Sequence, residues 1–304
     1  MPKISSNALF HFTNWDSLLG ILENGFHPRF SLEYITFKNN DTFGYAIPII
    51  SFCDIPLSQI KLHVYRYGSY GIGLKKEWGI SKGINPVLYV EKDSNLSNDI
   101  YDFTMNILKK YREEVGAIAE RYKKTNDKIL EFEKILNKDE VIKNMLNECK
   151  KELDTLDKLY DRANLRVKHI VNIIKYLKSY EGHSLGNHES LDEKIRFYDE
   201  REWRYIPDLK TCDNDLIKLD ITYGLMKKEM FYNSDTLNEA NSLLKMDNLS
   251  FQPDDIKYII IKEESEILEM IRKLDQIKGD KYPSNTIKIL TSRILTYDQI
   301  NDDF

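Results

Sequence analysis

Two carboxylates are the clearest candidates for chemistry in this chain. Glu200 and Glu202 lie in Phe197-Tyr198-Asp199-Glu200-Arg201-Glu202-Trp203-Arg204-Tyr205-Ile206-Pro207, a segment that alternates like a β-strand. Residues two apart on a strand point to the same face of the sheet. Glu202 can then accept a hydrogen bond from a ribose hydroxyl and stabilise an oxocarbenium-like centre, while Glu200 orients or deprotonates the nucleophile. Tyr198 and Trp203 would help to exclude water. The alternative interpretation is a structural ladder of salt bridges with the neighbouring arginines.

A second group of candidates lies in the first quarter of the chain. His11 stands between two phenylalanines and can hold ribose hydroxyls or a pyrophosphate by directional hydrogen bonds, with Thr13 on the same face to assist. Ser51 can bind a nicotinamide amide, and Tyr70 can stack on a nicotinamide or a base. Each also has a structural interpretation, because a histidine or serine on a strand is often satisfied by the backbone.

Sequence patterns predict the elements that would position these side chains. A strand is expected over 9–13, followed by a helix that Asn14 or Asp16 can cap and that Gly25 ends. A short helix is expected to begin at Pro56. Further strands are predicted at 47–52, 70–74, 85–90, 216–221 and 256–261, and further helices at 234–245, with Ser234 as N-cap, and at 264–274.

The stretch from residue 96 to 180 differs in character, with few glycines, no proline and many charges. Its apolar residues recur with a 4-3 rhythm over several heptads, which is typical of a coiled-coil seam. Two helices of about 35–40 residues, joined near Asn137, would form an antiparallel hairpin about 50–60 Å long. Such an arm dimerises, clamps a partner or acts as a spacer. Alternatively, it folds along its own domain and covers apolar surface.

The chain as a whole is predicted to form one α+β core that the helical arm splits in sequence, giving residues 1–95, the arm at 96–180 and residues 181–304. The net charge of −5, from 44 basic and 49 acidic residues, favours neither nucleic acid nor an anionic membrane as a partner. No apolar run is long enough to span a bilayer. The three cysteines are widely spaced and form no zinc pattern. No metal is therefore expected, and a cytoplasmic location is predicted.

Four stretches resemble the AbiGi family of bacterial abortive-infection proteins. They are Ser51-Phe52-Cys53-Asp54-Ile55-Pro56, Tyr70-Gly71-Ile72-Gly73-Leu74-Lys75-Lys76-Glu77-Trp78, Phe197 to Pro207, and the end from Ile287 through Thr296-Tyr297-Asp298-Gln299-Ile300 to Asp303-Phe304. The resemblance spans nearly the whole chain, with the arm as its least characteristic part. It implies a role in phage defence, as the antitoxin half of a two-gene system whose partner is a nucleotidyltransferase-like toxin.

The opening of the chain is similar to DarT-like and other ADP-ribosyltransferase-fold proteins. The similarity rests on Phe10-His11-Phe12-Thr13 followed by Leu18-Leu19-Gly20-Ile21-Leu22-Glu23-Asn24-Gly25. It implies an ADP-ribosyltransferase-like mixed sheet in which His11 matches the first motif, Glu202 the catalytic glutamate and Glu200 the upstream member of a Glu-x-Glu pair. Ser51 would stand in the middle motif but lacks the usual Ser-Thr-Ser surroundings.

Two main functional hypotheses follow from the sequence. In the first, the protein is an ADP-ribosyltransferase-like defence effector that cleaves NAD and modifies a macromolecule, with nucleic acid as one possible acceptor. In the second, it is an inactive antitoxin whose arm at 96–180 captures a cognate toxin or a phage component, or joins two copies into a homodimer. A nuclease or a nucleotide sensor using Asp54, Glu200 and Glu202 ranks last.

Overall fold

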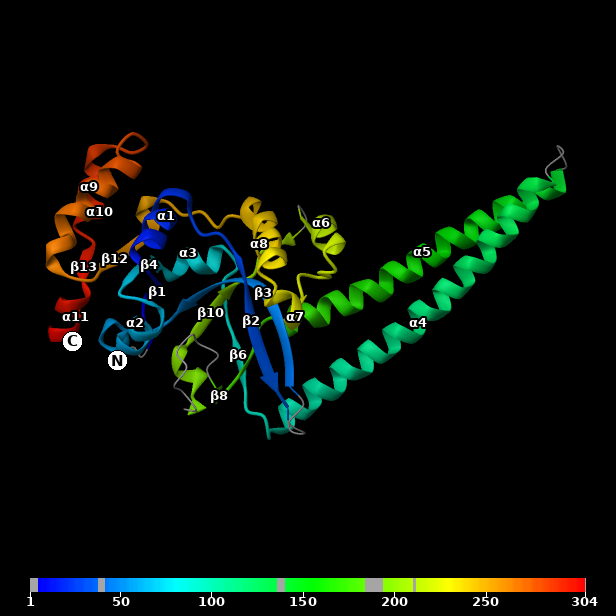
Figure 1. Ribbon diagram of the computed structural model, residues 1–304, viewed down its shortest axis with the longest axis horizontal. Helices are drawn as coiled ribbons and strands as arrows, with labels where there is room; N and C mark the ends of the chain where they lie inside the picture. The colour runs from blue at the N-terminus through cyan, green and yellow to red at the C-terminus, as the bar shows by residue number, and fades with distance from the viewer. Residues whose placement is uncertain (1–4, 38–41, 136–139, 184–193, 210–211, 304) are drawn as a thin grey trace. The chain divides into compact units, whose positions relative to one another are not determined.

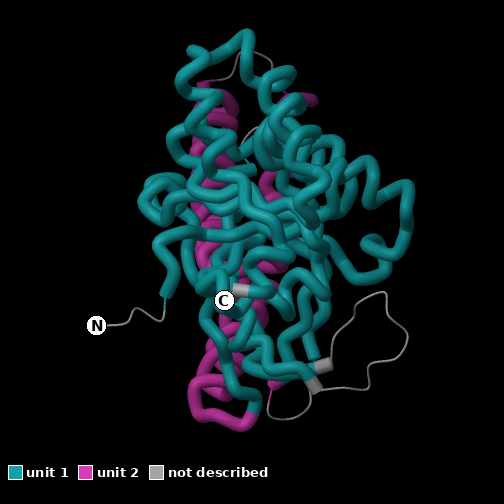
Figure 2. The backbone as a smooth tube through the Cα atoms, turned by 90° about the vertical axis from the view of Figure 1, so that its left-hand side faces the viewer, with its two compact units in different colours: residues 1–36, 40–92, 176–304 teal, residues 37–39, 93–175 magenta. Residues whose placement is uncertain are grey.

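The protein is described from a computed structural model that covers residues 5–37, 42–135, 140–183, 194–209 and 212–303. Its contacts divide the chain into two compact units (Figure 2). Unit 1 contains residues 1–36, 40–92 and 176–304, and unit 2 contains residues 37–39 and 93–175. Unit 1 holds all the described strands and unit 2 holds the two long helices, so the chain has the mixed α+β character that its sequence predicts.

The elements follow one another as Figure 1 shows. The strands are β1 (Ala8–Thr13), β2 (Arg29–Thr36), β3 (Thr42–Cys53), β4 (Tyr70–Lys75), β5 (Asn85–Pro86), β6 (Leu88–Val90), β7 (Leu177–Ser179), β8 (Gly182–His183), β9 (Lys194–Ile195), β10 (Glu202–Tyr205), β11 (Met226–Lys227), β12 (Ile256–Ile261) and β13 (Ile294–Thr296). The helices are α1 (Trp15–Asn24), α2 (Lys61–Tyr67), α3 (Lys76–Ser81), α4 (Asn95–Lys134), α5 (Glu140–Ile174), α6 (Asp213–Lys218), α7 (Lys228–Phe231), α8 (Ser234–Leu243), α9 (Ile267–Lys278), α10 (Ser284–Thr291) and α11 (Tyr297–Asp303).

A mixed sheet forms the centre of unit 1. Its strands run in the order β13-β12-β4-β1-β3-β10-β5, and β2 and β11 also pair with β3. The pairing of β12 with β13 is parallel, and the other pairings in this sheet are antiparallel. β6 and β7 form a separate parallel pair. In the sequence, β6 precedes the long helices of unit 2 and β7 follows them.

The sheet carries a hydrophobic cluster on each face, because apolar residues alternate along its strands. On β1, Leu9 packs into the cluster that includes residues of α1, α3, α9 and α10. Its neighbour Phe10 packs into the cluster that includes residues of α2 and α11. Successive side chains on a strand point to opposite faces, so the central strands are covered on both sides.

The first helix begins and ends where its sequence predicts. The side chain of Asn14 accepts a hydrogen bond from the Ser17 N–H at 2.8 Å, which satisfies one of the free N–H groups of the first turn. Gly25 follows the last turn with φ 78°, a conformation that glycine adopts without steric cost.

Two local expectations are wrong. The segment expected to be a strand at 216–221 contains the end of α6 (Asp213–Lys218). Its short apolar run suits either structure, and the acidic residues Asp213 and Asp215 in the first turn favour a helix. The N-cap of α8 is Asn233, whose side chain accepts the Thr236 N–H at 2.9 Å, and Ser234 is instead the first helical residue.

Unit 2 consists mainly of two long helices that lie side by side and run antiparallel (Figure 1). Ser94 caps α4 by accepting the Ser97 N–H at 3.1 Å. Tyr111 donates to Asn164 at 2.8 Å, and further along the pair Arg121 contacts Glu152 at 3.0 Å. The predicted pair of long helices is therefore present, while Asn137, where they were expected to join, lies outside the described residues.

Candidate functional site

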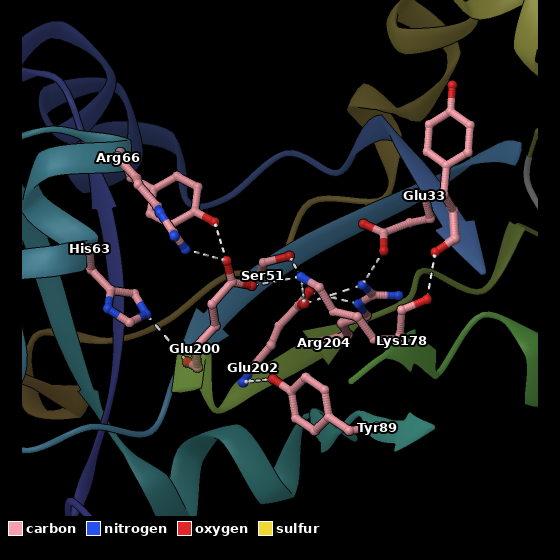
Figure 3. A network of polar contacts seen from close by, with 12 residues as sticks. Glu33, Ser51, His63, Arg66, Tyr89, Lys178, Glu200, Glu202 and Arg204 are labelled. Carbon is pink, nitrogen blue, oxygen red and sulfur yellow. Dashed lines mark hydrogen bonds and ion pairs between the residues drawn. The ribbon is translucent and has the colours of Figure 1, made fainter. Parts of the chain in front are cut away.

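One face of the sheet in unit 1 carries a polar cluster on three strands. Arg204 of β10 lies opposite Ser51 of β3 in the sheet register, and Glu202, two residues earlier, shares that face. β2 pairs with β3 in a register that turns Glu33 to the same side. Figure 3 shows these four side chains directed toward one another.

Glu200 reaches this cluster by a route that the sequence does not predict. Phe197–Glu200 forms a 3₁₀ turn, and Arg201 adopts a left-handed conformation with φ 46°. The expectation that Glu200 and Glu202 share one face of a single strand is therefore wrong. The left-handed residue redirects the chain between the two glutamates, and both carboxylates meet the ammonium group of Lys178.

The carboxylate of Glu202 is held by protein donors on both oxygens. Its Oε1 accepts hydrogen bonds from Ser51 Oγ at 2.8 Å and from Arg204 Nε at 2.6 Å. Its Oε2 accepts from Lys178 Nζ at 2.6 Å and from Arg204 Nη2 at 3.1 Å. A carboxylate has about four lone-pair sites, so these four bonds occupy the accepting capacity of Glu202. The residue is 5% exposed.

Glu200 is held in a similar way, mainly from α2. Its Oε1 accepts from Arg66 Nη1 at 3.0 Å and from the Tyr67 hydroxyl at 3.3 Å, and its Oε2 accepts from Lys178 Nζ at 2.7 Å. The backbone carbonyl of Glu200 accepts from His63 Nε2 at 3.3 Å. Lys178 comes from β7, so one ammonium group joins β7 to both glutamates.

The cluster balances three carboxylates with three cations, namely Glu33, Glu200 and Glu202 with Arg66, Lys178 and Arg204. Arg204 is fully buried and also contacts Glu33 Oε2 at 2.6 Å. Burial opposes ionisation of Glu202, but Arg204 and Lys178 outweigh it and hold the pKa of Glu202 well below its usual range. Burial would lower the pKa of Lys178, but the carboxylates of Glu202, Glu33 and Glu200 hold it well above normal. Glu202 and Lys178 are therefore charged at neutral pH.

A cavity of about 170 Å³ adjoins the cluster. Its lining includes Phe10, His11, Phe12, Ser31, Glu33, Ser51, Phe52, Cys53, His63, Tyr67, Lys178, Glu200 and Glu202. The aromatic wall differs from the expected one, because phenylalanines of β1 and β3 provide it. Tyr198 is 54% exposed and, together with Trp203, lines a separate cavity of about 260 Å³.

His11 lines the same cavity, but its ring is turned toward other groups. The imidazole packs edge-on against Phe26 and Phe52, with ring centroids 5.2 and 5.8 Å away. These rings belong to the cluster on the face opposite to that of Glu202. His11 Nδ1 donates to the Ser51 carbonyl at 2.8 Å, and burial lowers the pKa of His11 although this hydrogen bond opposes the shift. His11 is therefore a neutral residue of an aromatic cluster.

Two other predicted site residues lie away from the cavity lining. Thr13 closes β1, where its carbonyl oxygen would lie 2.3 Å from a Cβ at Gly68. The hydroxyl of Tyr70 donates to Glu266 Oε1 at 2.6 Å, and its ring packs against Trp15. Of the predicted residues, the structure thus brings His11, Ser51, Glu200 and Glu202 to one cavity, and it separates Thr13 and Tyr70 from it.

The site is an ion network in which protein donors already occupy both carboxylate oxygens of Glu202. A ribose hydroxyl could reach Glu202 as a donor only if Lys178, Arg204 or Ser51 first released the carboxylate. The cavity of about 170 Å³ is also smaller than pockets that enclose drug-sized ligands, which measure roughly 300–1,000 Å³. The residues as they are arranged here therefore do not fit a bound NAD.

Several members of the network were not found from the sequence. Lys178 belongs to a three-residue strand that carries no periodic signal, and it meets the glutamates through pairing that is distant in sequence. Glu33 and Arg66 are charged residues of the kind that most often lie in solvent. Among the described residues, no group of three or more His, Cys, Asp or Glu side chains is placed to hold a metal ion, and no helix is long and apolar enough to cross a membrane.

Comparison with known proteins gives a consistent result. A family model described as "Putative abortive phage resistance protein AbiGi, antitoxin" matches residues 24–262. The abortive phage resistance protein AbiGi of Lactococcus lactis subsp. cremoris is 26% identical over 293 residues, which cover 92% of this chain and 99% of that protein. No solved structure matches the chain significantly, so the ADP-ribosyltransferase-like fold stays a prediction.

Proposed function

The chain belongs to the AbiGi family, and we propose that it acts in abortive phage resistance as an antitoxin that neutralises a toxin by binding it. The matching family model is described as an antitoxin, and its range of 24–262 includes the polar cluster and both long helices. The Lactococcus relative is similar over almost its whole length. The range of the family model thus includes all of unit 2 and most of unit 1.

The observation that carries this proposal is the occupied carboxylate of Glu202. All four of its acceptor sites are filled by Ser51, Lys178 and Arg204. A catalytic carboxylate must offer an acceptor site to its substrate, whereas a protein that neutralises by binding needs a stable surface and no free catalytic group. The network supports the second role because it ties β2, β3, β7, β10 and α2 together.

Co-purification with the cognate toxin tests the proposal. We expect the tagged chain to elute with the toxin in a fixed ratio and to restore growth of cells that produce the toxin. Ser51→Ala removes one donor to Glu202 with a small change in volume, so this variant should still bind and neutralise. Restored growth without a complex, or a complex that leaves the toxin active, would contradict neutralisation by binding.

A second candidate is an ADP-ribosyltransferase-like effector that cleaves NAD. It is favoured by the presence of Ser51, Glu200 and Glu202 around one cavity. The cavity would have to widen, and Glu202 would have to exchange a protein donor for a substrate hydroxyl. NAD consumption by the purified protein, with and without phage-infected lysate as a source of acceptor, decides this candidate beside a Glu202→Gln variant whose folding is checked by circular dichroism. Loss of NAD that depends on Glu202 would support it, and equal NAD levels with the two folded proteins in both conditions would exclude it.

A further inference from the structure

The helical arm, defined here as α4 and α5, exposes much apolar surface. Of the 23 large apolar side chains that are exposed among the described residues, eleven lie in residues 93–175. They are Leu96, Phe103, Met105, Leu130, Ile135, Val141, Met145, Leu159, Tyr160, Leu165 and Ile173. A two-helix hairpin can bury one stripe on each helix. Apolar surface outside those stripes needs another covering, and contiguous patches of this kind mark interaction sites.

The arm also carries a groove, and Tyr160 is the one member of this exposed set that lines it. The groove has a volume of about 590 Å³, and its apolar lining comes from Val115, Ile118, Ala119 and Tyr122 of α4 and from Tyr160 of α5. Tyr160 is 43% exposed, although it continues the helical spacing of buried residues on α5. The seam between the helices is therefore open at this point. The side chain of Ala119 is small, so it leaves space in the groove for a bulky side chain of another molecule.

The charges on α4 alternate in blocks along the helix. Residues 109–112 carry three bases and no acid, and residues 113–120 carry three acids and no base. Residues 121–128 then carry four bases and one acid, and residues 131–133 carry two acids. When a second α4 lies antiparallel to the first, with residues 120 and 121 of the two helices side by side, each charge block lies opposite a block of the other sign. The two described arm helices together carry fifteen bases and fourteen acids, so a large net repulsion is absent.

We propose that the groove is closed by the same groove of a second copy, with the two α4 helices antiparallel about a two-fold axis near residues 120 and 121. The axis coincides with the middle of the groove, whose α4 lining runs from Val115 to Asp127. In this register Tyr122 of each copy faces Ala119 of the other, so that a large side chain meets a small one. A two-fold interface of this kind is self-complementary, as closed dimers require.

The charge pairs already present on the arm do not prevent this association. Arg121 with Glu152 and Lys124 with Glu120 are exposed pairs, and such pairs contribute about 0–1 kcal/mol each. They can therefore be rearranged or shared with the opposite block of the second copy. Mixed charges on one surface favour a second copy over a partner of a single charge sign.

The contact area is sufficient for a reversible dimer. In this register residues 107–134 of the two α4 helices overlap, and a strip about 40 Å long and one helix diameter wide, about 10 Å, covers on the order of 400 Å² on each copy. The total of about 800 Å² lies in the size range of weak, transient interfaces and below that of stable ones. We therefore expect an equilibrium between monomer and dimer that responds to protein concentration, and one that weakens in high salt because the charge blocks are exposed.

The proposal is tested by sedimentation or light scattering on the full chain over a range of concentrations. The wild-type mass should rise from 35.9 kDa toward twice that value. Ala119→Arg places a long cation in the groove and should keep the protein monomeric. Ala117→Arg is the matched control, because Ala117 is also exposed but lies about 200° around the helix from Ala119. This control should dimerise like the wild type.

Two results would overturn the proposal. One is a wild-type protein that stays at 35.9 kDa at the highest concentration. The other is a dimer that Ala119→Arg and Ala117→Arg affect equally, with circular dichroism showing both variants folded. A charge test adds independent evidence, since changing Glu113, Glu114 and Glu120 to lysine should abolish self-association. Toxin neutralisation is measured separately, so failure of the dimer and failure of the antitoxin proposal remain distinguishable.

Discussion

Replacing Lys178 with methionine removes the cation that separates two buried carboxylates. Nζ of Lys178 lies 2.7 Å from Glu200 Oε2 and 2.6 Å from Glu202 Oε2. Methionine keeps most of the length and apolar volume of the side chain. The substitution therefore tests the charge of Lys178 with little change in packing.

The expected loss of stability follows from these distances. The two carboxylate oxygens can be no more than 5.3 Å apart, since each contacts the same nitrogen. Two like charges about 5 Å apart repel by roughly 3 kcal/mol at an effective dielectric constant of about 20. Removing one partner of a buried ion pair typically costs about 3–5 kcal/mol. We therefore expect Lys178→Met to lower the free energy of unfolding by about 3–5 kcal/mol.

Urea unfolding followed by tryptophan fluorescence measures this loss in unit 1, which contains the network. All three tryptophans, at positions 15, 78 and 203, lie in unit 1 with the network. Adding Glu200→Gln to Lys178→Met should recover more than half of the lost stability, because it removes the repulsion. A loss below about 1 kcal/mol, the value of an exposed pair, would refute the reasoning. So would a double variant that is no more stable than Lys178→Met.

Further predictions concern pH, backbone strain and the arm. Burial lowers the pKa of His11 and of His63 in the folded protein, so the unfolded chain binds protons first as the pH falls. The free energy of unfolding should then decrease below pH 6.5, by up to about 1.4 kcal/mol per pH unit for each histidine. Urea midpoints at pH 7.5 and pH 5.5 measure this decrease. A His11→Phe variant whose stability depends on pH as strongly as that of the wild type would count against it. Gly68→Ala would place a Cβ 2.3 Å from a backbone oxygen at φ 116°, whereas the Cβ of Gly83→Ala, at φ 75°, would meet open space. We expect Gly68→Ala to lower the melting temperature by more than Gly83→Ala does. Equal shifts would show that the close approach at Gly68 has no cost. Leu156→Ala removes a fully buried side chain from α5 and should destabilise unit 2 by about 2–5 kcal/mol, seen as earlier loss of helical circular dichroism with an unchanged fluorescence transition.

The elements with strong periodic patterns could be predicted from the sequence. The first strand and helix, with Asn14 and Gly25 at the helix ends, follow local rules of capping and alternation. The two long helices follow from heptads sustained over many turns. The strand Arg29–Thr36 is absent from the sequence-based expectations, although Arg29 to Tyr34 alternate between polar and apolar side chains as a half-buried strand does. The short α6 was mistaken for a strand because a brief apolar run has no diagnostic period.

The site was predicted in part, and its missing members are non-local. Glu200 and Glu202 attract attention as a pair, but their arrangement depends on the left-handed Arg201, which tertiary contacts hold in place. Lys178 lies more than twenty residues before them and reaches them through a short strand. His11 was expected to face a ligand, whereas the sheet turns its ring into an aromatic cluster. Single-sequence patterns do not report which distant strands become neighbours.

The most direct test of neutralisation by binding is a titration of purified, active cognate toxin with the purified chain in buffer that contains the toxin's own substrates but no NAD. The account predicts inhibition that is complete at a fixed molar ratio and that is unchanged when NAD is added. Inhibition by far less than an equivalent of the chain, or inhibition that requires NAD, would contradict it and show that the protein modifies its target enzymatically.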